Sequence, residues 1–247
     1  MKQAQAIHIG TSGWTYDHWQ GPFYPPEQGK SGRNLLTYYA PHFSTVEVNN
    51  SFYQLPAEQT VRHWCKSVPA DFLFAVKASR YITHQKKLND PEESVSRFLQ
   101  RVRSFGDRLG PILFQLPPRW HVNTDRLHAF LKVLPSDVRY TVEFRDPTWF
   151  HDEVYALLRE HGVAFCIYDL QGRLSPKEVT TDFVYLRLHG PHEEAYTGSY
   201  PPQTLAGWAG AFTTWTQQGK EVFCYFDNDA HGFAPQNAKA LQEMISR

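Results

Sequence analysis

Charged and polar side chains alternate with apolar ones in several short runs of this sequence. Residues 45–49 read TVEVN, residues 72–77 read FLFAVK, residues 140–145 read YTVEFR and residues 183–189 read FVYLRLH. Carboxylates, lysine and histidine are the groups that enzymes use for acid–base and nucleophilic chemistry. We therefore take as candidate catalytic residues Glu47, Lys77, Glu143 and His189.

The alternation also predicts which way these side chains point. Successive side chains of a strand face opposite sides, so Glu47 and Asn49 lie opposite Val46 and Val48. The apolar face needs a covering layer of helices, so the polar face is expected to point into a barrel. The interior would then contain two acidic and two basic residues, namely Glu47, Glu143, Lys77 and Arg187. Such a charge-balanced group is either a structural ion network or the floor of a ligand site.

Eight runs of this kind predict eight strands. They occupy residues 6–10, 45–49, 72–77, 111–116, 140–145, 163–169, 183–189 and 221–227. Helical patterns lie between most of them, and the clearest covers residues 90–109, where Asp90 is the expected N-cap. Glycines that suit helix ends precede three of the strands, at positions 110, 162 and 219. The order predicts one (β/α)8 TIM barrel over residues 1–247, with a short or irregular sixth helix in residues 170–181.

Three long connections follow strands, over residues 10–33, 78–89 and 190–203. Connections after strands lie at the C-terminal face of such a barrel, where active sites are built. The chain contains 7 Trp, 13 Tyr and 17 Phe, and many of them fall in loops. We therefore expect a pocket with an aromatic rim at this face.

Composition favours some partners and disfavours others. Lys plus Arg and Asp plus Glu both total 25, so no overall positive charge indicates nucleic acid. No apolar run approaches the roughly 20 residues that span a bilayer, and the first residues do not resemble a signal peptide. Three cysteines without a close pair do not indicate a disulfide framework or a zinc site. We expect a cytoplasmic protein without a membrane partner.

Six short motifs stand out: GTSGW at 10–14, VEVNNSFY at 46–53, LFQLPP at 113–118, VEFR at 142–145, LRLHG at 186–190 and YFDND at 225–229. Together they resemble the motifs of the DUF72 family. The motifs occur in order over nearly the whole chain. The resemblance implies a TIM barrel and brings no settled activity with it. It also implies pocket residues, namely Glu47, Asn49, Lys77, Gln115, Glu143, Arg145, Arg187, His189 and Asn228.

Three chemical hypotheses follow. The first is a Mg or Mn site, with candidate ligands at successive strand ends that are similar to those of sugar-isomerase and apurinic-endonuclease barrels: Glu143, Asp169, His189 and Asp227. Arg145 and Arg187 would compete for these carboxylates. The second hypothesis is metal-free chemistry, with Glu47 and Glu143 as an acid–base pair. In it Lys77 is a base or a Schiff-base former unless it pairs with Glu47, and His84 and His189 are proton shuttles.

The third hypothesis is binding of phosphate or nucleic acid by clustered basic and aromatic side chains. Arginine pairs favour a small anion over a polynucleotide in a neutral chain. We therefore expect an enzyme, of unresolved hydrolase or isomerase/lyase class, acting on a small anionic or sugar-like substrate. The alternatives are a metal-dependent phosphodiesterase or endonuclease-like protein, a nucleic-acid-binding protein, and a non-catalytic ligand-binding protein. The candidate substrate-binding residues are Trp14, Asn49, Tyr53, His84, Gln115, Arg145, Arg187, Tyr196 and Asn228.

Overall fold

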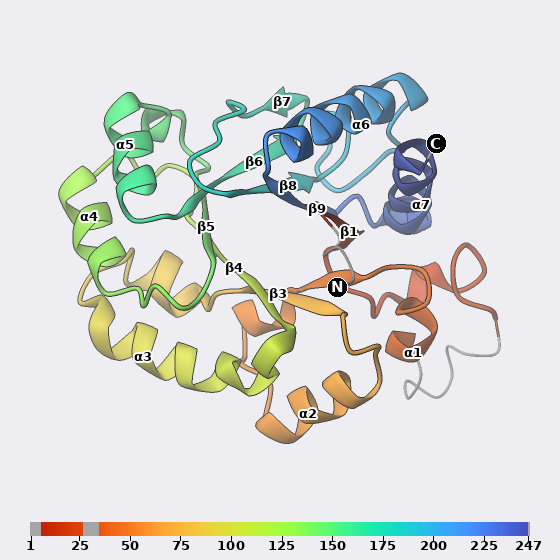
Figure 1. Ribbon diagram of the computed structural model, residues 1–247, viewed down its shortest axis with the longest axis horizontal. Helices are drawn as coiled ribbons and strands as arrows, with labels where there is room; N and C mark the ends of the chain where they lie inside the picture. The colour runs from red at the N-terminus through yellow and green to blue at the C-terminus, as the bar shows by residue number, and fades with distance from the viewer. Residues whose placement is uncertain (1–5, 27–34, 247) are drawn as a thin grey trace.

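The computed structural model describes residues 6–26 and 35–246, and strands and helices alternate along it (Figure 1). The strands are β1 (Ile7–Thr11), β2 (Thr45–Val48), β3 (Leu73–Lys77), β4 (Leu109–Gln115), β5 (Tyr140–Glu143), β6 (Ala164–Leu170), β7 (Arg173–Leu174), β8 (Phe183–Leu188) and β9 (Glu221–Phe226). The α-helices are α1 (Leu35–Tyr39), α2 (Glu58–Lys66), α3 (Pro91–Val102), α4 (Thr124–Lys132), α5 (Asp152–Glu160), α6 (Pro202–Gln217) and α7 (Phe233–Ile245).

Eight of the strands are parallel and run in the order β1-β9-β8-β6-β5-β4-β3-β2. The two ends of this sheet meet, because Ser12 and Glu47 form a parallel bridge and the Gly13 N–H donates to the Glu47 carbonyl at 2.8 Å. The helices lie outside the strands (Figure 1). The predicted (β/α)8 TIM barrel is therefore confirmed, as a nearly closed barrel.

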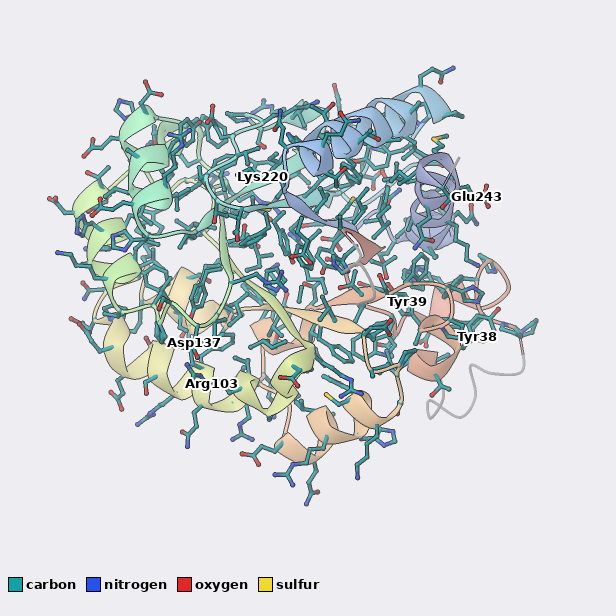
Figure 2. The ribbon with its side chains drawn as sticks, viewed as in Figure 1. Tyr38, Tyr39, Arg103, Asp137, Lys220 and Glu243 are labelled. Carbon is teal, nitrogen blue, oxygen red and sulfur yellow. The ribbon has the colours of Figure 1, made fainter. Side chains whose placement is uncertain are left out.

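Tyr39 and Gly10 hold the seam between β1 and β2. The Tyr39 hydroxyl donates to the Thr45 carbonyl at 3.1 Å and accepts from the Thr11 N–H at 2.9 Å; Figure 2 labels this tyrosine. A Cβ atom on Gly10 would lie 2.2 Å from the Thr45 carbonyl oxygen. The two strands approach this closely because residue 10 has no side chain.

Strand alternation separates two hydrophobic clusters, as expected. The smaller cluster fills the barrel and contains Ala75, Leu113, Ala164, Cys166, Phe183, Tyr185, Phe223 and Tyr225. The larger cluster lies between the strands and the helices and includes Val46, Val76 and Leu186. Residues two positions after the interior set, such as Lys77 and Arg187, therefore point into the barrel mouth.

The sixth connection has the irregular form that its sequence indicates. Within the described chain, residues 171–182 contain no helix, and β7 instead pairs antiparallel with the end of β6. Gln171 and Gly172 make the turn between them with φ values of 54° and 70°. The resulting hairpin projects at the C-terminal end of the barrel next to β6.

Two details of the predicted helix ends are wrong. Gly162 and Gly219 have the positive φ values expected after a helix, 62° and 76°, but Gly110 lies inside β4. A Cβ there would lie 3.1 Å from the Phe74 carbonyl oxygen, so this glycine permits close approach of β3. The segment expected to be helical to residue 109 is α3 followed by 3-10 turns. Asp90 occupies the N-cap position of α3 as predicted, without a side-chain hydrogen bond.

The long connections follow strands, as predicted. The segment after β3 includes a π-helical turn, η4 (Tyr81–Gln85), and the segment after β8 is irregular up to α6. Of the predicted loop 10–33, residues 27–33 lie outside the described residues. No helix among residues 6–26 and 35–246 is long and apolar enough to cross a membrane.

Candidate functional site

Arg187 lies at the centre of a buried ion network in the barrel mouth. Its side chain is 1% exposed, and Nε and Nη2 donate to the two Glu47 carboxylate oxygens at 3.0 and 2.8 Å. Nη1 donates to Glu143 Oε2 and Nη2 to Asp227 Oδ2, both at 3.0 Å. Burial alone would lower the pKa of Arg187, but these three carboxylates raise it. Arg187 therefore remains charged, and three carboxylates share its positive charge.

The Glu47 carboxylate has no free position for a ligand. Besides Arg187, its oxygens accept hydrogen bonds from the hydroxyls of Ser12 and Tyr185, the latter at 2.6 Å. The glutamate is fully buried. A carboxylate with this many donors and no contact with solvent has the surroundings typical of a structural counterion.

Glu143, Arg145 and His189 form the upper part of the network. Arg145 Nε pairs with Glu143 Oε1, and Arg145 Nη2 lies 3.2 Å from His189 Nε2. Burial raises the pKa of Glu143, but the guanidinium groups of Arg145 and Arg187 outweigh it and hold this pKa below the usual range. Glu143 therefore stays ionised and is a poor proton acceptor.

His189 has a defined tautomer in this environment. Its Nε2 faces two guanidinium groups, Arg145 Nη2 at 3.2 Å and Arg187 Nη1 at 3.3 Å, so this nitrogen must accept. Nδ1 then carries the proton and donates to Asp227 Oδ2 at 2.9 Å. Burial and the two arginines lower the pKa of His189 well below its ordinary value. His189 is therefore a neutral imidazole.

A loss of stability in mild acid is expected from two histidines. Burial lowers the pKa of His189 and, together with Lys77, lowers the pKa of His84 to about 4. Below an unfolded-state pKa of about 6.5 the unfolded chain binds more protons, so the free energy of unfolding falls as pH falls from 7.5 to 5.5. Urea unfolding at pH 7.5 and 5.5 measures this free energy. The decrease between the two pH values should be smaller for His84→Asn and for His189→Asn than for the wild type.

The exposed His63 on α2 supplies the control for this comparison, since His63→Gln should retain the wild-type fall. Equal falls in all three variants would contradict the assignment of neutral histidines to the barrel mouth.

Lys77 stands apart from the network. No carboxylate among the described residues lies within ion-pair distance of its Nζ, which sits 4.6 Å from the centre of the Phe52 ring. Burial and Arg187 lower the pKa of Lys77 to about 8, against the opposite effect of Glu143 and Glu47. The predicted alternative, a simple Lys77–Glu47 salt bridge, is not formed.

A cavity of about 680 Å³ opens beside this network. It is lined by Gln115, Pro118, Arg145, Pro147, Phe150, Tyr168, Leu170, Gln171, Arg173, Leu174, Ser175, Ala195 and Tyr196. Two of these residues are arginines and none is acidic. The Arg145 guanidinium carbon lies 5.1 Å from the centre of the Tyr168 ring, which supports the planar group from one side.

Gln115, Arg145 and Tyr196 are the sequence-predicted binding residues that line this cavity. Tyr196 is 44% exposed, and its ring lies edge-on to His189 with centroids 5.6 Å apart. The predicted catalytic residues Glu47, Glu143 and His189 lie behind the cavity wall and are fully buried. A ligand in the cavity would meet the network through Arg145.

A second group of predicted residues surrounds the mouth near β2 and β3. His84 lies edge-on to the Phe52 ring at 5.0 Å, and Tyr53 is 74% exposed. The Asn49 side-chain oxygen is buried and accepts no hydrogen bond within the described part of the chain. These residues are on the Lys77 side of the mouth, away from the 680 Å³ cavity lining.

Two predicted binding residues have structural surroundings instead. Trp14 is buried against Trp64 with ring centroids 5.0 Å apart, because the loop after β1 folds back over α2. Asn228 is fully buried, and its amide donates to the Gly198 carbonyl and to Asn237 Oδ1, both at 2.8 Å. It ties the loop after β8 to the start of α7.

The predicted metal ligands do not come together as a set. Asp169 shares the helix-facing side of β6 with Phe165 and Ile167, and it hydrogen-bonds to Tyr200. Glu143, His189 and Asp227 do meet, but the Arg187 guanidinium contacts Glu143 Oε2, His189 Nε2 and Asp227 Oδ2, and His189 Nδ1 donates directly to Asp227. Within residues 6–26 and 35–246, no group of three or more His, Cys, Asp or Glu side chains is arranged to hold a metal ion.

Residues that the sequence analysis missed complete the site. They are Ser12, Phe52, Tyr168, Arg173 and Tyr185. Alternation along β6 and β8 places Tyr168 and Tyr185 on the interior face, so the same rule that found Glu143 and Arg187 applies to them. Arg173 reaches the cavity because of the β7 hairpin, for which the sequence has no comparable signal.

Known proteins resemble much or nearly all of this chain. Residues 8–247 match the family described as "Protein of unknown function DUF72". The UPF0759 protein YunF of Bacillus subtilis (strain 168) is 26% identical, and the match covers 97% of this chain and 94% of that protein. The UPF0759 protein YecE of Escherichia coli (strain K12) is 33% identical over 153 residues, covering 58% of this chain and 50% of YecE.

Solved structures agree with this assignment. A DUF72 family protein from Thermotoga maritima MSB8 superimposes with a TM-score of 0.89 at 28% identity, over 98% of this chain and 100% of that one. A DUF72 family protein from Enterococcus faecalis V583 shares the fold, with a TM-score of 0.84 at 22% identity over 98% and 96% of the chains. The barrel, the motifs and these matches together show that the chain belongs to the DUF72 family.

Proposed function

We propose that this chain is an enzyme that binds a small carboxylated or phosphorylated substrate in the cavity above Arg145. The observation that carries the proposal is a cavity of about 680 Å³ with two arginines and no acidic residue in its lining. Guanidinium groups bind carboxylate and phosphate through paired, charge-assisted hydrogen bonds. The position at the C-terminal ends of barrel strands supports an enzyme over a structural role.

The Arg145 side chain is preorganised for binding such a ligand. Its Nε is fixed by Glu143 and its Nη2 by His189, while Nη1 has no hydrogen-bond partner among the described residues. The side chain is 10% exposed, so it is fixed by its neighbours and yet reaches the cavity. A donor that is already oriented loses little conformational entropy on binding. We infer that Glu143 and His189 act as positioning residues for Arg145.

Arg173 and Tyr196 would complete the binding of the anion. Arg173 lies on the exposed β7 hairpin and lines the same cavity. Tyr196 has φ 67°, an uncommon backbone conformation for a non-glycine residue, and its ring covers the side of the cavity nearest His189. Strained backbone of this kind often occurs where a side chain must be presented to a ligand.

Loss of Arg145 should weaken anion binding strongly. A hydrogen bond to a charged group contributes about 1.5–3 kcal/mol, so Arg145→Met should raise the Kd for oxalate or inorganic phosphate roughly 10- to 100-fold. Arg173→Met should have a smaller effect, because that side chain is exposed to solvent. Isothermal titration calorimetry with each anion measures both values.

Arg103→Met is the control, since Arg103 pairs with Asp137 on the outer surface (Figure 2). Unchanged affinity in Arg145→Met would contradict the proposed anion site. Tighter binding of a single-stranded oligonucleotide than of either anion, falling steeply with salt, would favour the nucleic-acid alternative instead.

A further inference from the structure

The Lys77 amine is a cation in the barrel mouth that the ion network does not use. Glu47 is already bonded by Arg187, Ser12 and Tyr185, and Glu143 by Arg187 and Arg145. Lys77 Nζ makes no hydrogen bond or ion pair with any residue that the structure describes, although its side chain is partly buried. A partly desolvated amine that forms no ion pair is unusual in a structural role.

The end of β3 holds this lysine in a fixed place. The Ser51 hydroxyl lies 2.6 Å from the Lys77 carbonyl oxygen and 2.8 Å from the Val48 carbonyl oxygen, so it joins the ends of β2 and β3. The Phe52 ring lies under Nζ, and His84 packs edge-on against that ring. The Ser51 hydrogen bonds and the Phe52 ring therefore fix the backbone and the apolar support of this lysine.

Lys77 and Arg145 lie on opposite sides of one strand. β4 separates β3 from β5, and its Gln115 pairs in register with Glu143 and lines the cavity. Strands separated by one neighbour are roughly 10 Å apart, and a lysine side chain extends over much of that distance. A molecule bound to Arg145 would reach the Lys77 amine by extending past Gln115, across the end of β4 and out of the cavity toward β3.

We propose that Lys77 is a nucleophile that forms an imine with the carbonyl carbon of a small 2-oxo acid whose carboxylate is bound by Arg145. This inference rests on the proposed anion site and names the substrate class for it. The neutral amine attacks the carbonyl carbon, and a proton moves from nitrogen to the carbonyl oxygen to give a carbinolamine. Loss of that oxygen as water leaves the imine, so no oxidant or reductant is needed.

The amine has the reactivity that this step needs. Burial and Arg187 lower the pKa of Lys77 to about 8. At pH 8 its neutral fraction is then on the order of a hundred times that of an ordinary lysine. The protonated imine that forms would keep the positive charge close to Glu143 and Glu47, which favour a cation at this position.

Reductive trapping tests the proposal. The full-length protein is incubated at pH 8 with pyruvate and sodium cyanoborohydride, which reduces the imine to a stable secondary amine, and the labelled peptides are identified by mass spectrometry. We expect Lys77 to be labelled at least tenfold faster than the exposed Lys66 and Lys132. Oxalate, which has no ketone, should slow the labelling of Lys77 but not of the surface lysines.

Matched variants separate the two parts of the argument. Lys77→Arg should abolish site-specific labelling, and Lys220→Arg should not, because the Lys220 amine is bonded to the Thr181 carbonyl away from the mouth. Oxalate binding without labelling of Lys77 would overturn the imine and leave the anion site intact. Labelling of Lys77 that oxalate does not slow, with no oxalate bound in calorimetry, would overturn the proposed function. Equal labelling of all lysines would overturn the nucleophile.

Discussion

Replacing Arg187 by methionine is expected to lower the free energy of unfolding by about 3–5 kcal/mol. The substitution keeps a long side chain but leaves Glu47, Glu143 and Asp227 buried without the cation that they share. Glu143 still pairs with Arg145, so Glu47 is the carboxylate most affected by the loss of the Arg187 charge. Urea unfolding monitored by tryptophan fluorescence measures the change.

Arg103→Met is again the matched control, because the Arg103–Asp137 pair is half-exposed and should contribute only about 0–1 kcal/mol (Figure 2). The double variant Arg187→Met with Glu47→Gln should recover part of the loss, since it removes one of the uncompensated charges. A loss below about 1 kcal/mol in Arg187→Met would show that the network is not a main source of stability.

The second large effect is expected at the barrel seam. Gly10→Ala places a methyl carbon 2.2 Å from the Thr45 carbonyl oxygen, and this oxygen belongs to the backbone of β2 and cannot turn away. The strands must separate or distort, so we expect a loss of about 3 kcal/mol or more, or a failure to fold. Thermal unfolding and urea titration measure the change.

Gly207 provides the control for the seam prediction. It lies in α6, where an added Cβ meets no atom within 4 Å. Gly207→Ala should therefore stabilise the protein by up to about 1 kcal/mol through helix propensity. A Gly10→Ala protein with wild-type stability would contradict this prediction, because it would show that β1 and β2 can move apart at little cost in free energy.

The ion network and the cavity are parts of one arrangement. Arg187 draws carboxylates from β2, β5 and the end of β9 together, and Glu143 in turn fixes Arg145 at the cavity. A buried network of this kind is costly to desolvate, and it is maintained only where every member has partners. The rigidity of the network explains how Arg145 is held at the cavity while its Nη1 has no partner among the described residues.

The amino-acid sequence determined the barrel and its charged interior. Period-two alternation along short strands is a local property, so Glu47, Lys77, Glu143 and Arg187 could be assigned to one face without knowledge of their neighbours. Helix–glycine–strand junctions are equally local, and Gly162 and Gly219 have the predicted conformation. The same rule places Tyr168 inside and Asp169 outside, so alternation is a better guide here than the strand-end position that predicted Asp169 as a metal ligand.

Only the tertiary structure decided which charges pair and which remain free. Glu47 is bonded by Arg187, 140 positions away along the chain, and this leaves the nearby Lys77 without a carboxylate. Trp14 and Trp64 meet only because a loop folds back, so the sequence could not separate core aromatics from those at the rim. Pairing in a barrel depends on tilt and closure, which are set by all eight strands together, whereas the direction of a side chain depends on its own strand.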